Sequence, residues 1–262
     1  MGEIQRIDNL EFEDISSRHK FGKIKLTKDY FVTVLLYLIK DVEGIYFKGG
    51  TAINKILLAH ARLSEDIDFS LTREVSEVKN EIVKIIEKSS LFNNITYDKD
   101  VGGFLRIVAH YTDFDGRKDT VFIDLNKRAK LALKPEKHKL NHFYAPFIPE
   151  FSVNTVAKEE IIAEKVAATI GRNKPRDHFD VYKIIQAGIP INLELVKKKC
   201  EESDDDFSIL KMFNNAKKLK NRWDKDMKAL LSEPITFQEV IIFLSKHFKL
   251  KEEKDKLKDK KQ

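Results

Sequence analysis

The chain has 262 residues and a formal net charge of +6, with 42% hydrophobic and 34% charged residues. This balance indicates a globular protein with a charge-rich surface. The longest apolar run, between Tyr30 and Ile39, is too short to cross a bilayer, and the single cysteine, Cys200, excludes an internal disulfide. Residues 1–14 contain no apolar core after a basic start, so we expect no signal peptide, no membrane association and a cytoplasmic location.

Much of the positive charge lies at the C-terminus rather than on the body of the chain. Lys246 to Gln262 contains eight lysines against four acidic residues. The segment after Phe248 is rich in charged residues and poor in apolar ones, so we predict a charged, disordered tail over residues 249–262. A merely solvated tail and a tail that binds RNA are both compatible with this charge.

Helical and strand patterns alternate over the first 150 residues. Apolar spacing predicts a helix at Thr27–Lys40, with Thr27 as its N-cap, and a short extended segment at Ile45–Phe47 before a glycine turn. The elements predicted next are helix Thr51–His60, strand Asp66–Leu71, helix Glu74–Ser89, strand Phe104–Tyr111 and strand Thr120–Lys127. We therefore expect a mixed α/β domain over residues 1–150, built on a mainly antiparallel sheet.

The pattern becomes helical after Phe151. The preceding segment, Leu131–Pro149, contains three prolines and is the expected crossover. The helices predicted beyond it are Lys158–Ile170, Asp177–Gln186, Asn192–Lys199, Phe207–Leu219, Arg222–Leu231 and Thr236–Phe248. The expected fold class is therefore α+β, with a helical domain over residues 151–248.

Two carboxylates share one face of the predicted strand Asp66–Leu71. Residues two apart in a strand point to the same side, so Asp66 and Asp68 leave one face while Ile67 and Phe69 pack on the other. Neighbouring carboxylates repel unless a cation lies between them, and hard oxygen ligands suit Mg²⁺. An ordinary solvated strand face is the alternative interpretation of this pair.

The Gly49–Gly50–Thr51 turn lies between the extended segment and the next helix. Glycine lets the backbone approach a ligand, and a helix N-terminus offers free N–H groups to an anion, to which Thr51 adds a hydroxyl. A phosphate-binding turn followed by a metal-binding strand is what phosphoryl or nucleotidyl transfer from a triphosphate requires. A tight turn capped by Thr51 is the alternative.

A third carboxylate, Asp124, lies on the predicted strand Thr120–Lys127, on the face opposite Ile123. From a neighbouring strand it could join the metal pair, help to ligate a second ion and act as base for an attacking hydroxyl. An exposed strand aspartate explains Asp124 equally well.

Two charged residues of the helical half are further candidates. Lys165 projects from the apolar face of the predicted helix Lys158–Ile170, where a lysine is costly unless it meets a partner, such as a triphosphate, or snorkels to the surface. Asp177 lies at the start of the next helix, where an acid also interacts favourably with the helix N-terminus. Arg176 could pair with Asp177 or contact phosphate, and Asp180 lies one helical turn further on.

Four segments together resemble a known family. They are Lys48–Lys55 (KGGTAINK), Arg62–Phe69 (RLSEDIDF), Glu164–Lys165 and Lys174–Asp180 (KPRDHFD). The resemblance is to the AbiEii/MenT-type nucleotidyltransferases, toxin components of type IV toxin–antitoxin and abortive-infection systems within the DNA polymerase β-like nucleotidyltransferase superfamily. It spans roughly Lys48 to Tyr182 and implies a polymerase β-like N-terminal domain with nucleotidyltransferase activity.

The resemblance also implies roles for individual residues. Asp66 and Asp68 would hold Mg²⁺, with two ions expected and Mn²⁺ as an alternative, and Asp124 is the natural third carboxylate. Lys165 would bind nucleotide phosphates, and Asp177 would belong to the catalytic set. The residues expected to hold the NTP, by resemblance or by their position beside these motifs, are Gly49, Gly50, Thr51, Arg62, Ser64, Lys165 and Arg176.

The expected reaction is transfer of NMP from an NTP to an acceptor, with release of pyrophosphate. By family analogy the acceptor is RNA, with tRNA favoured, and a cognate antitoxin protein is an expected partner. Three alternatives stay open: modification of a protein side chain by the same core, a non-catalytic module that binds nucleotide or a partner protein, and a DxD glycosyltransferase. The last is disfavoured because its parallel sheet is not predicted.

Overall fold

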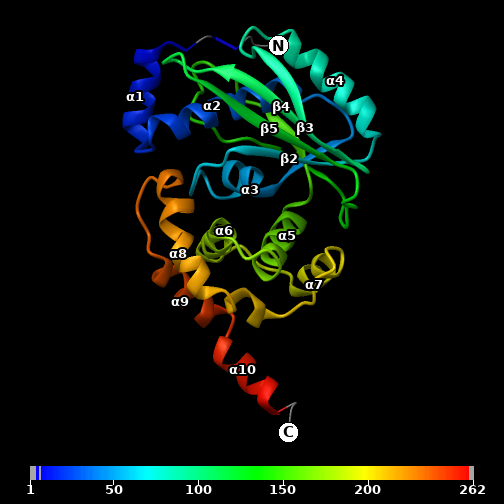
Figure 1. Cartoon of the computed structure of the whole chain (residues 1–262), viewed down its shortest axis with the longest axis vertical. Helices are drawn as coiled ribbons and strands as arrows, with labels where there is room; N and C mark the ends of the chain where they lie inside the picture. The colour runs from blue at the N-terminus through cyan, green and yellow to red at the C-terminus, as the bar shows by residue number, and fades with distance from the viewer. Residues whose placement is uncertain (1–3, 6, 260–262) are drawn as a thin grey trace. The chain divides into compact units, whose positions relative to one another are not determined.

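The computed structural model describes residues 4, 5 and 7–259, with side chains as far as Asp255. It divides into two compact units, Met1–Lys158 and Glu159–Gln262, here called the sheet unit and the helical unit (Figure 1). Strand β7 (Ser152–Thr155) pairs with β1 (Ile45–Lys48). The first unit therefore continues past residue 150, where the sequence pattern placed the domain boundary.

The sheet unit is built on a seven-stranded sheet in the order β3-β4-β5-β2-β1-β7-β6. Its remaining strands are β2 (Asp66–Leu71), β3 (Asn94–Val101), β4 (Phe104–Thr112), β5 (Lys118–Asn126) and β6 (Glu136–Lys139). The β2–β5 and β1–β7 pairs are parallel, and the other neighbouring pairs are antiparallel. The expectation of a mainly antiparallel sheet is confirmed.

Helices α2 (Lys23–Ile39) and α4 (Val75–Glu87) contact each other. Helix α2 also contacts β5, and α4 contacts β3 and β4. On α4 the buried residues Val78, Ile82 and Ile86 recur at helical spacing, which gives this helix one apolar face for packing. Helix α2 begins ahead of Thr27, whose hydroxyl donates to the Lys23 carbonyl (2.8 Å) inside the helix. The prediction of Thr27 as the N-cap is therefore wrong.

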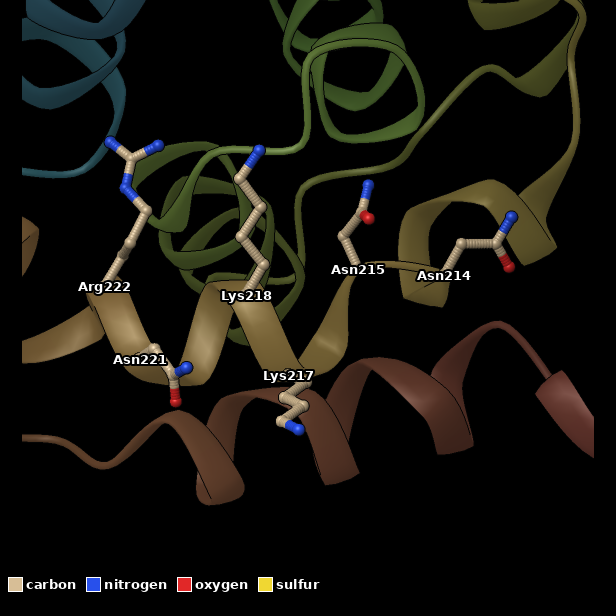
Figure 2. Close-up of a pocket in the computed structure, with 6 residues that line it drawn as sticks. All are labelled: Asn214, Asn215, Lys217, Lys218, Asn221 and Arg222. Atoms are coloured by element: carbon tan, nitrogen blue, oxygen red, sulfur yellow. The ribbon is translucent and has the colours of Figure 1, made fainter.

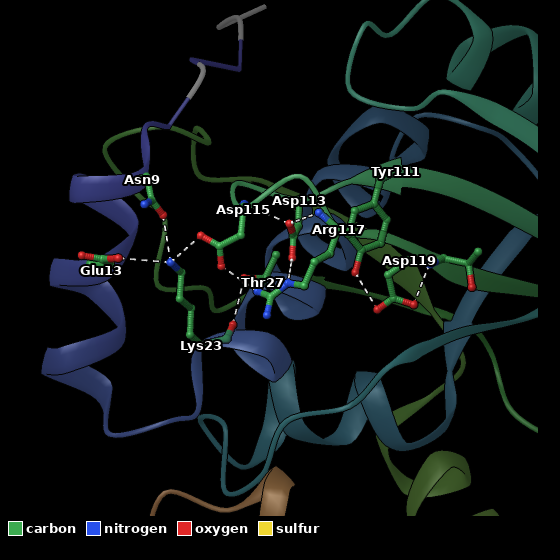
Figure 3. Close-up of polar contacts among 10 residues, drawn as sticks. Asn9, Glu13, Lys23, Thr27, Tyr111, Asp113, Asp115, Arg117 and Asp119 are labelled. Atoms are coloured by element: carbon green, nitrogen blue, oxygen red, sulfur yellow. Dashed lines mark hydrogen bonds and ion pairs between the residues drawn. The ribbon is translucent and has the colours of Figure 1, made fainter.

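A lysine at the start of α2 connects three segments of the sheet unit. Figure 3 shows Lys23 between Asn9 and Glu13 of α1 (Asn9–His19) and Asp115 of the β4–β5 hairpin, with Nζ–O distances of 3.0, 3.1 and 2.9 Å. Helix α1, absent from the sequence prediction, begins at a capping box between Asp8 and Glu11. These contacts hold the N-terminal helix on the sheet unit.

A buried ion pair links α2 to the segment that follows the glycine turn. Lys55 Nζ lies 2.7 Å from Asp29 Oδ1, and both side chains are only 1% exposed. Lys55 also donates to Thr33 Oγ1 (3.0 Å), and Tyr144 donates its hydroxyl to Asp29 Oδ2 (3.1 Å). Burial, and then the charge of Lys55, lower the pKa of the neighbouring His60 to about 3, which keeps this imidazole neutral at physiological pH.

The helical unit contains α5 (Lys158–Ile170), α6 (Pro175–Gln186), α7 (Leu193–Glu201), α8 (Ala216–Met227), α9 (Phe237–His247) and α10 (Leu250–Asp259). The helices predicted at Phe207–Leu219 and Arg222–Leu231 are replaced by α8 and a 3₁₀ turn on either side of it. Leu219, Trp223 and Met227 are buried at four-residue spacing, so one apolar face continues across the predicted break.

The tail after Phe248 differs from the disordered segment expected over residues 249–262. It forms α10 as far as Asp259, with Glu252 and Glu253 in the first turn, where acidic residues suit the helix dipole. Residues 260–262 lie outside the described part of the chain. No helix among the described residues is long and apolar enough to span a membrane.

The buried Lys55–Asp29 pair generates a stability prediction. Replacing Lys55 by Met leaves Asp29 buried without its cation, and we expect the free energy of unfolding to fall by about 3–5 kcal/mol in urea titrations. The matched control is Lys139→Met. Lys139 lies at the same 2.7 Å from Glu150, but these side chains are 59% and 69% exposed, so the loss should stay below about 1 kcal/mol. Equal losses in the two variants would contradict the account.

Candidate active site

The acidic strand β2 lies inside the sheet, between β5 and β1. Ile67 and Phe69 are buried, whereas Asp66 and Asp68 are half-buried on the opposite side of the strand. This is the alternation that the sequence predicts, and the strand bounds also agree. Two carboxylates therefore project from one face of a strand that is fixed on both edges.

The glycine turn lies directly against one of these carboxylates. Lys48, the last residue of β1, is in register with Asp68, and Gly49 follows it at φ +77°. A Cβ on Gly49 would overlap the carboxylate of Asp68, with its Cγ at only 2.9 Å. A residue other than glycine is therefore disfavoured here for two reasons, a positive φ and the space that the Asp68 carboxylate already occupies.

Thr51 joins the turn to the acidic strand from the other side. Its hydroxyl donates to the backbone carbonyl of Asp66, and its side chain is buried. Asn54 completes the connection, because its side chain donates to the Gly50 carbonyl (3.0 Å) and accepts from the Arg62 amide (3.0 Å). The Thr51 hydroxyl thus positions the backbone of Asp66, and its expected contact with phosphate stays a prediction.

The segment between the turn and β2 is less regular than the helix predicted at Thr51–His60. A short α-helix, α3 (Gly49–Ala52), continues into a π-helix at Ile53–Leu57. The chain then folds back, with positive φ at His60 and a hydrogen bond from the His60 amide to the Asn54 carbonyl (2.7 Å). The sequence did not predict this tight turn, after which the chain reaches the start of β2.

Two further residues expected to contact phosphate lie in the loop before β2. Arg62 is buried, and its guanidinium donates to the Leu63 carbonyl (2.9 Å). Ser64 is half-buried between Leu63 and β2. Arg62 therefore supports the backbone of the loop, and Ser64 is the better placed of the two to meet a ligand.

The third carboxylate, Asp124, lies beside Asp66 and Asp68, but it forms an ion pair with an arginine. Asp124 on β5 is in register with Asp68, so both side chains leave the same face of the sheet. Arg106, opposite Asp124 on β4, donates to both of its carboxylate oxygens, at 2.7 and 2.8 Å. These hydrogen bonds, despite some burial, hold the pKa of the Arg106 guanidinium above its usual value. Sequence reasoning did not identify Arg106, because its partner is set by strand register.

The oxygen ligands on this face of the sheet meet part of what a divalent cation needs. Asp66 and Asp68 supply hard oxygen ligands on one face, and the absence of a Cβ on Gly49 makes space for the Asp68 carboxylate itself. Among the described residues, no group of three His, Cys, Asp or Glu side chains is gathered closely enough to hold an ion. The residues therefore suit an ion held by two carboxylates whose remaining ligands come from substrate phosphates and water. They do not form the three-carboxylate cluster that we expected.

A second group of charged residues lies within the helical unit. Lys165 on α5 is buried, with Nζ 2.9 Å from Asp177 and 3.0 Å from Asp180, both buried on α6. Arg172, in the loop between these helices, donates to both oxygens of Asp177 at 2.8 and 2.7 Å. Burial alone would raise the pKa of Asp177, but Lys165 and Arg172 hold it well below its usual value.

The partners of Lys165 are therefore carboxylates of its own unit. The prediction that this lysine needs a partner is confirmed, whereas the sequence left open which partner it has. Arg176, half-buried at the start of α6, lies beside this cluster in sequence. Arg172 was not anticipated, since an arginine in a Gly-Arg-Asn loop carries no signal of its fold-back onto Asp177.

The chain is similar to known proteins in both its sequence and its fold. The family model described as "Nucleotidyl transferase AbiEii toxin, Type IV TA system" matches residues 36–242. The fold is similar to MenT4, a nucleotidyltransferase toxin of Mycobacterium tuberculosis, with a TM-score of 0.65, 21% identity and coverage of 90% of this chain and 88% of that one. It is also similar to JHP933 of Helicobacter pylori, with a TM-score of 0.59, 18% identity and coverage of 92% and 100%. No curated protein matches the sequence.

The contact between Gly49 and Asp68 can be tested by substitution at two glycines. Gly49 and Gly116 have nearly the same positive φ, +77° and +79°, but a Cβ on Gly116 would meet nothing within 4 Å. Alanine at either position should cost about 1–2 kcal/mol of stability through the backbone. Only Gly49→Ala should also displace Asp68, and we expect it to weaken Mn²⁺ binding, measured by electron paramagnetic resonance, by about tenfold or more. Equal Mn²⁺ affinity in the two variants would contradict this.

Proposed function

Since the chain belongs to the AbiEii family of nucleotidyltransferase toxins, we propose that it transfers a nucleoside monophosphate from an NTP to an RNA acceptor, with tRNA favoured, in a Mg²⁺-dependent reaction. The chain is a nucleotidyltransferase by family. The residues of the site, rather than the fold, select the base of the NTP and the acceptor.

One observation carries the proposal. The Gly49 backbone lies against the carboxylate of Asp68, and the Thr51 hydroxyl holds the carbonyl of Asp66. The turn at the start of α3 therefore lies beside the two carboxylates that are proposed to bind metal. A triphosphate that contacts the turn through its oxygens would present other oxygens to a cation on Asp66 and Asp68, which supports an NTP as the substrate.

In this proposal Asp66 and Asp68 hold Mg²⁺. When bound, Mg²⁺ neutralises charge that develops on the phosphate oxygens. The sheet fixes both carboxylates before substrate arrives, so little reorganisation is needed during the reaction. Asp124 is proposed to act through Arg106, whose cationic guanidinium it holds at 2.7 and 2.8 Å on the same face. Arg106 is thereby available to stabilise negative charge beside the two ligands.

The proposed reaction is an in-line displacement at the α-phosphorus. An acceptor hydroxyl oxygen forms a bond to the α-phosphorus, and the bond from that phosphorus to the bridging oxygen of the β-phosphate breaks. Pyrophosphate leaves, and the hydroxyl proton passes to solvent or to a carboxylate of the site. The bond that forms is a phosphoester on the acceptor, so a ribose hydroxyl of RNA is a suitable nucleophile.

The helical unit is proposed to supply phosphate contacts from its basic residues. Lys165 is held by Asp177 and Asp180, and Arg172 by Asp177. Asp177 therefore acts as a positioning residue for both cations, while Lys165 and the half-buried Arg176 are the proposed phosphate ligands. A cognate antitoxin protein is the partner that the toxin family suggests.

The test is incorporation of label from each α-³²P-NTP into purified total RNA with Mg²⁺. Asp66→Asn and Asp68→Asn should each lower the rate by about 10³-fold, because loss of a metal ligand removes several kcal/mol of transition-state stabilisation. Asp100→Asn is the control, since Asp100 lies exposed on β3 of the same sheet, and it should retain the wild-type rate.

The destination of the label decides between the functions. Label in RNA supports the proposal, and tRNA is identified by the size of the labelled band. Label in protein instead identifies a protein-modifying transferase. Absence of incorporation from all four NTPs, or full activity in both aspartate variants, would overturn the proposal.

A further inference from the structure

The surface of α8 carries an unusual excess of positive charge. Between Phe207 and Leu231 the chain contains seven lysines and arginines and two aspartates. The apolar side of α8 is buried through Leu219, Trp223 and Met227. The basic residues of α8 are therefore confined to its exposed side.

A hollow of about 390 Å³ lies along the first turns of this helix, and we call it the α8 hollow. Its lining residues are Asn214, Asn215, Lys217, Lys218, Asn221 and Arg222. Figure 2 shows Lys218, Arg222 and Asn215 projecting from one side of the helix, while Lys217 and Asn221 project from the other. Residues in each of these two rows are three or four apart, so the rows extend lengthwise along the helix.

The nitrogen donors of this hollow are largely uncommitted. All six lining side chains are exposed. Among the described residues, neither Lys217 nor Lys218 forms an ion pair, and Arg222 pairs only with Asp226, at 2.8 Å, through one terminal nitrogen. No acidic residue lines the hollow. Lysine, arginine and asparagine side chains are what proteins use to contact phosphate oxygens.

The same lining indicates which part of a nucleic acid is contacted. It contains no aromatic ring on which a base could stack. Trp223, next to Arg222 in sequence, is buried, and its indole donates to the Ile235 carbonyl (2.8 Å). Recognition of unpaired bases relies on such stacking platforms. The α8 hollow is therefore suited to a phosphate backbone rather than to bases.

We propose that the α8 hollow binds the phosphodiester backbone of the RNA acceptor, as a site separate from the Gly49–Asp68 site. The identity of the RNA rests on the proposed function, whereas the polyanion contact rests on the lining of the hollow. Contacts of this kind hold the substrate independently of its sequence. They leave the choice of the reacting nucleotide to other residues.

The test compares two pairs of exposed lysines in the full-length chain. Lys217→Glu/Lys218→Glu reverses two charges in the hollow. Lys197→Glu/Lys198→Glu makes the same change on α7, where both lysines are exposed and form no ion pair with a described residue. Binding of fluorescent total tRNA is measured by anisotropy over a range of salt concentrations. Thermal unfolding of each variant, and the milder Lys217→Gln/Lys218→Gln variant, show whether a loss of binding is a loss of fold.

The hollow variant should bind tRNA about tenfold or more weakly, and the slope of log Kd against log salt should fall by about 0.7 for each lost contact to single-stranded phosphate. The α7 variant should bind within about twofold of wild type, because it alters only the net charge. Equal losses in both variants, or wild-type binding by the hollow variant, would overturn the inference.

Two further arms identify the phosphate source and separate this inference from the proposed function. Displacement of the fluorescent tRNA by Mg²⁺-NTP as effectively as by an equal concentration of unlabelled tRNA would assign the hollow to free nucleotide and overturn the RNA assignment. Label transfer to RNA by a hollow variant at the wild-type rate and KM would overturn the inference and leave the proposed function standing. If the wild-type chain binds tRNA through the hollow but transfers no label, the inference stands and the proposed function is overturned.

Discussion

The absence of one Cβ atom shapes the site of the sheet unit. Because Gly49 has no side chain, the backbone that follows β1 can lie against the carboxylate of Asp68. The Thr51 hydroxyl then holds the strand at Asp66. The glycine turn and the acidic strand, the two parts of the proposed metal–triphosphate site, are thereby held together.

Buried ion pairs support both units. Asp29 and Lys55 connect α2 to the segment behind the glycine turn, and Lys165 and Asp177 connect α5 to α6. Each pair is costly to bury and tolerable only because further hydrogen bonds satisfy its atoms. The two pairs differ in the exposure of their neighbours. Arg172, which donates to Asp177, is exposed to solvent, so the Lys165–Asp177 cluster can also meet a ligand.

Features of the structure that depend on residues close together in the sequence were mostly predicted, whereas features that depend on residues far apart were not. Strand β2 and helix α5 were predicted with their bounds because alternation and helical spacing are local. Strand β3 was not predicted, because it is an exposed edge strand without buried alternation. The candidate carboxylates were identified from local spacing, whereas Arg106 on Asp124 was missed, because strand register determines that pairing.

The central claim is that the glycine turn and the acidic strand form one metal–triphosphate site. A crystal structure with Mn²⁺ and a non-hydrolysable NTP analogue tests it most directly. The account predicts an anomalous Mn²⁺ peak bonded to carboxylate oxygens of Asp66 and Asp68, with the triphosphate against the backbone of Gly49 and Gly50. A peak elsewhere, or a triphosphate bound away from this turn, would contradict it.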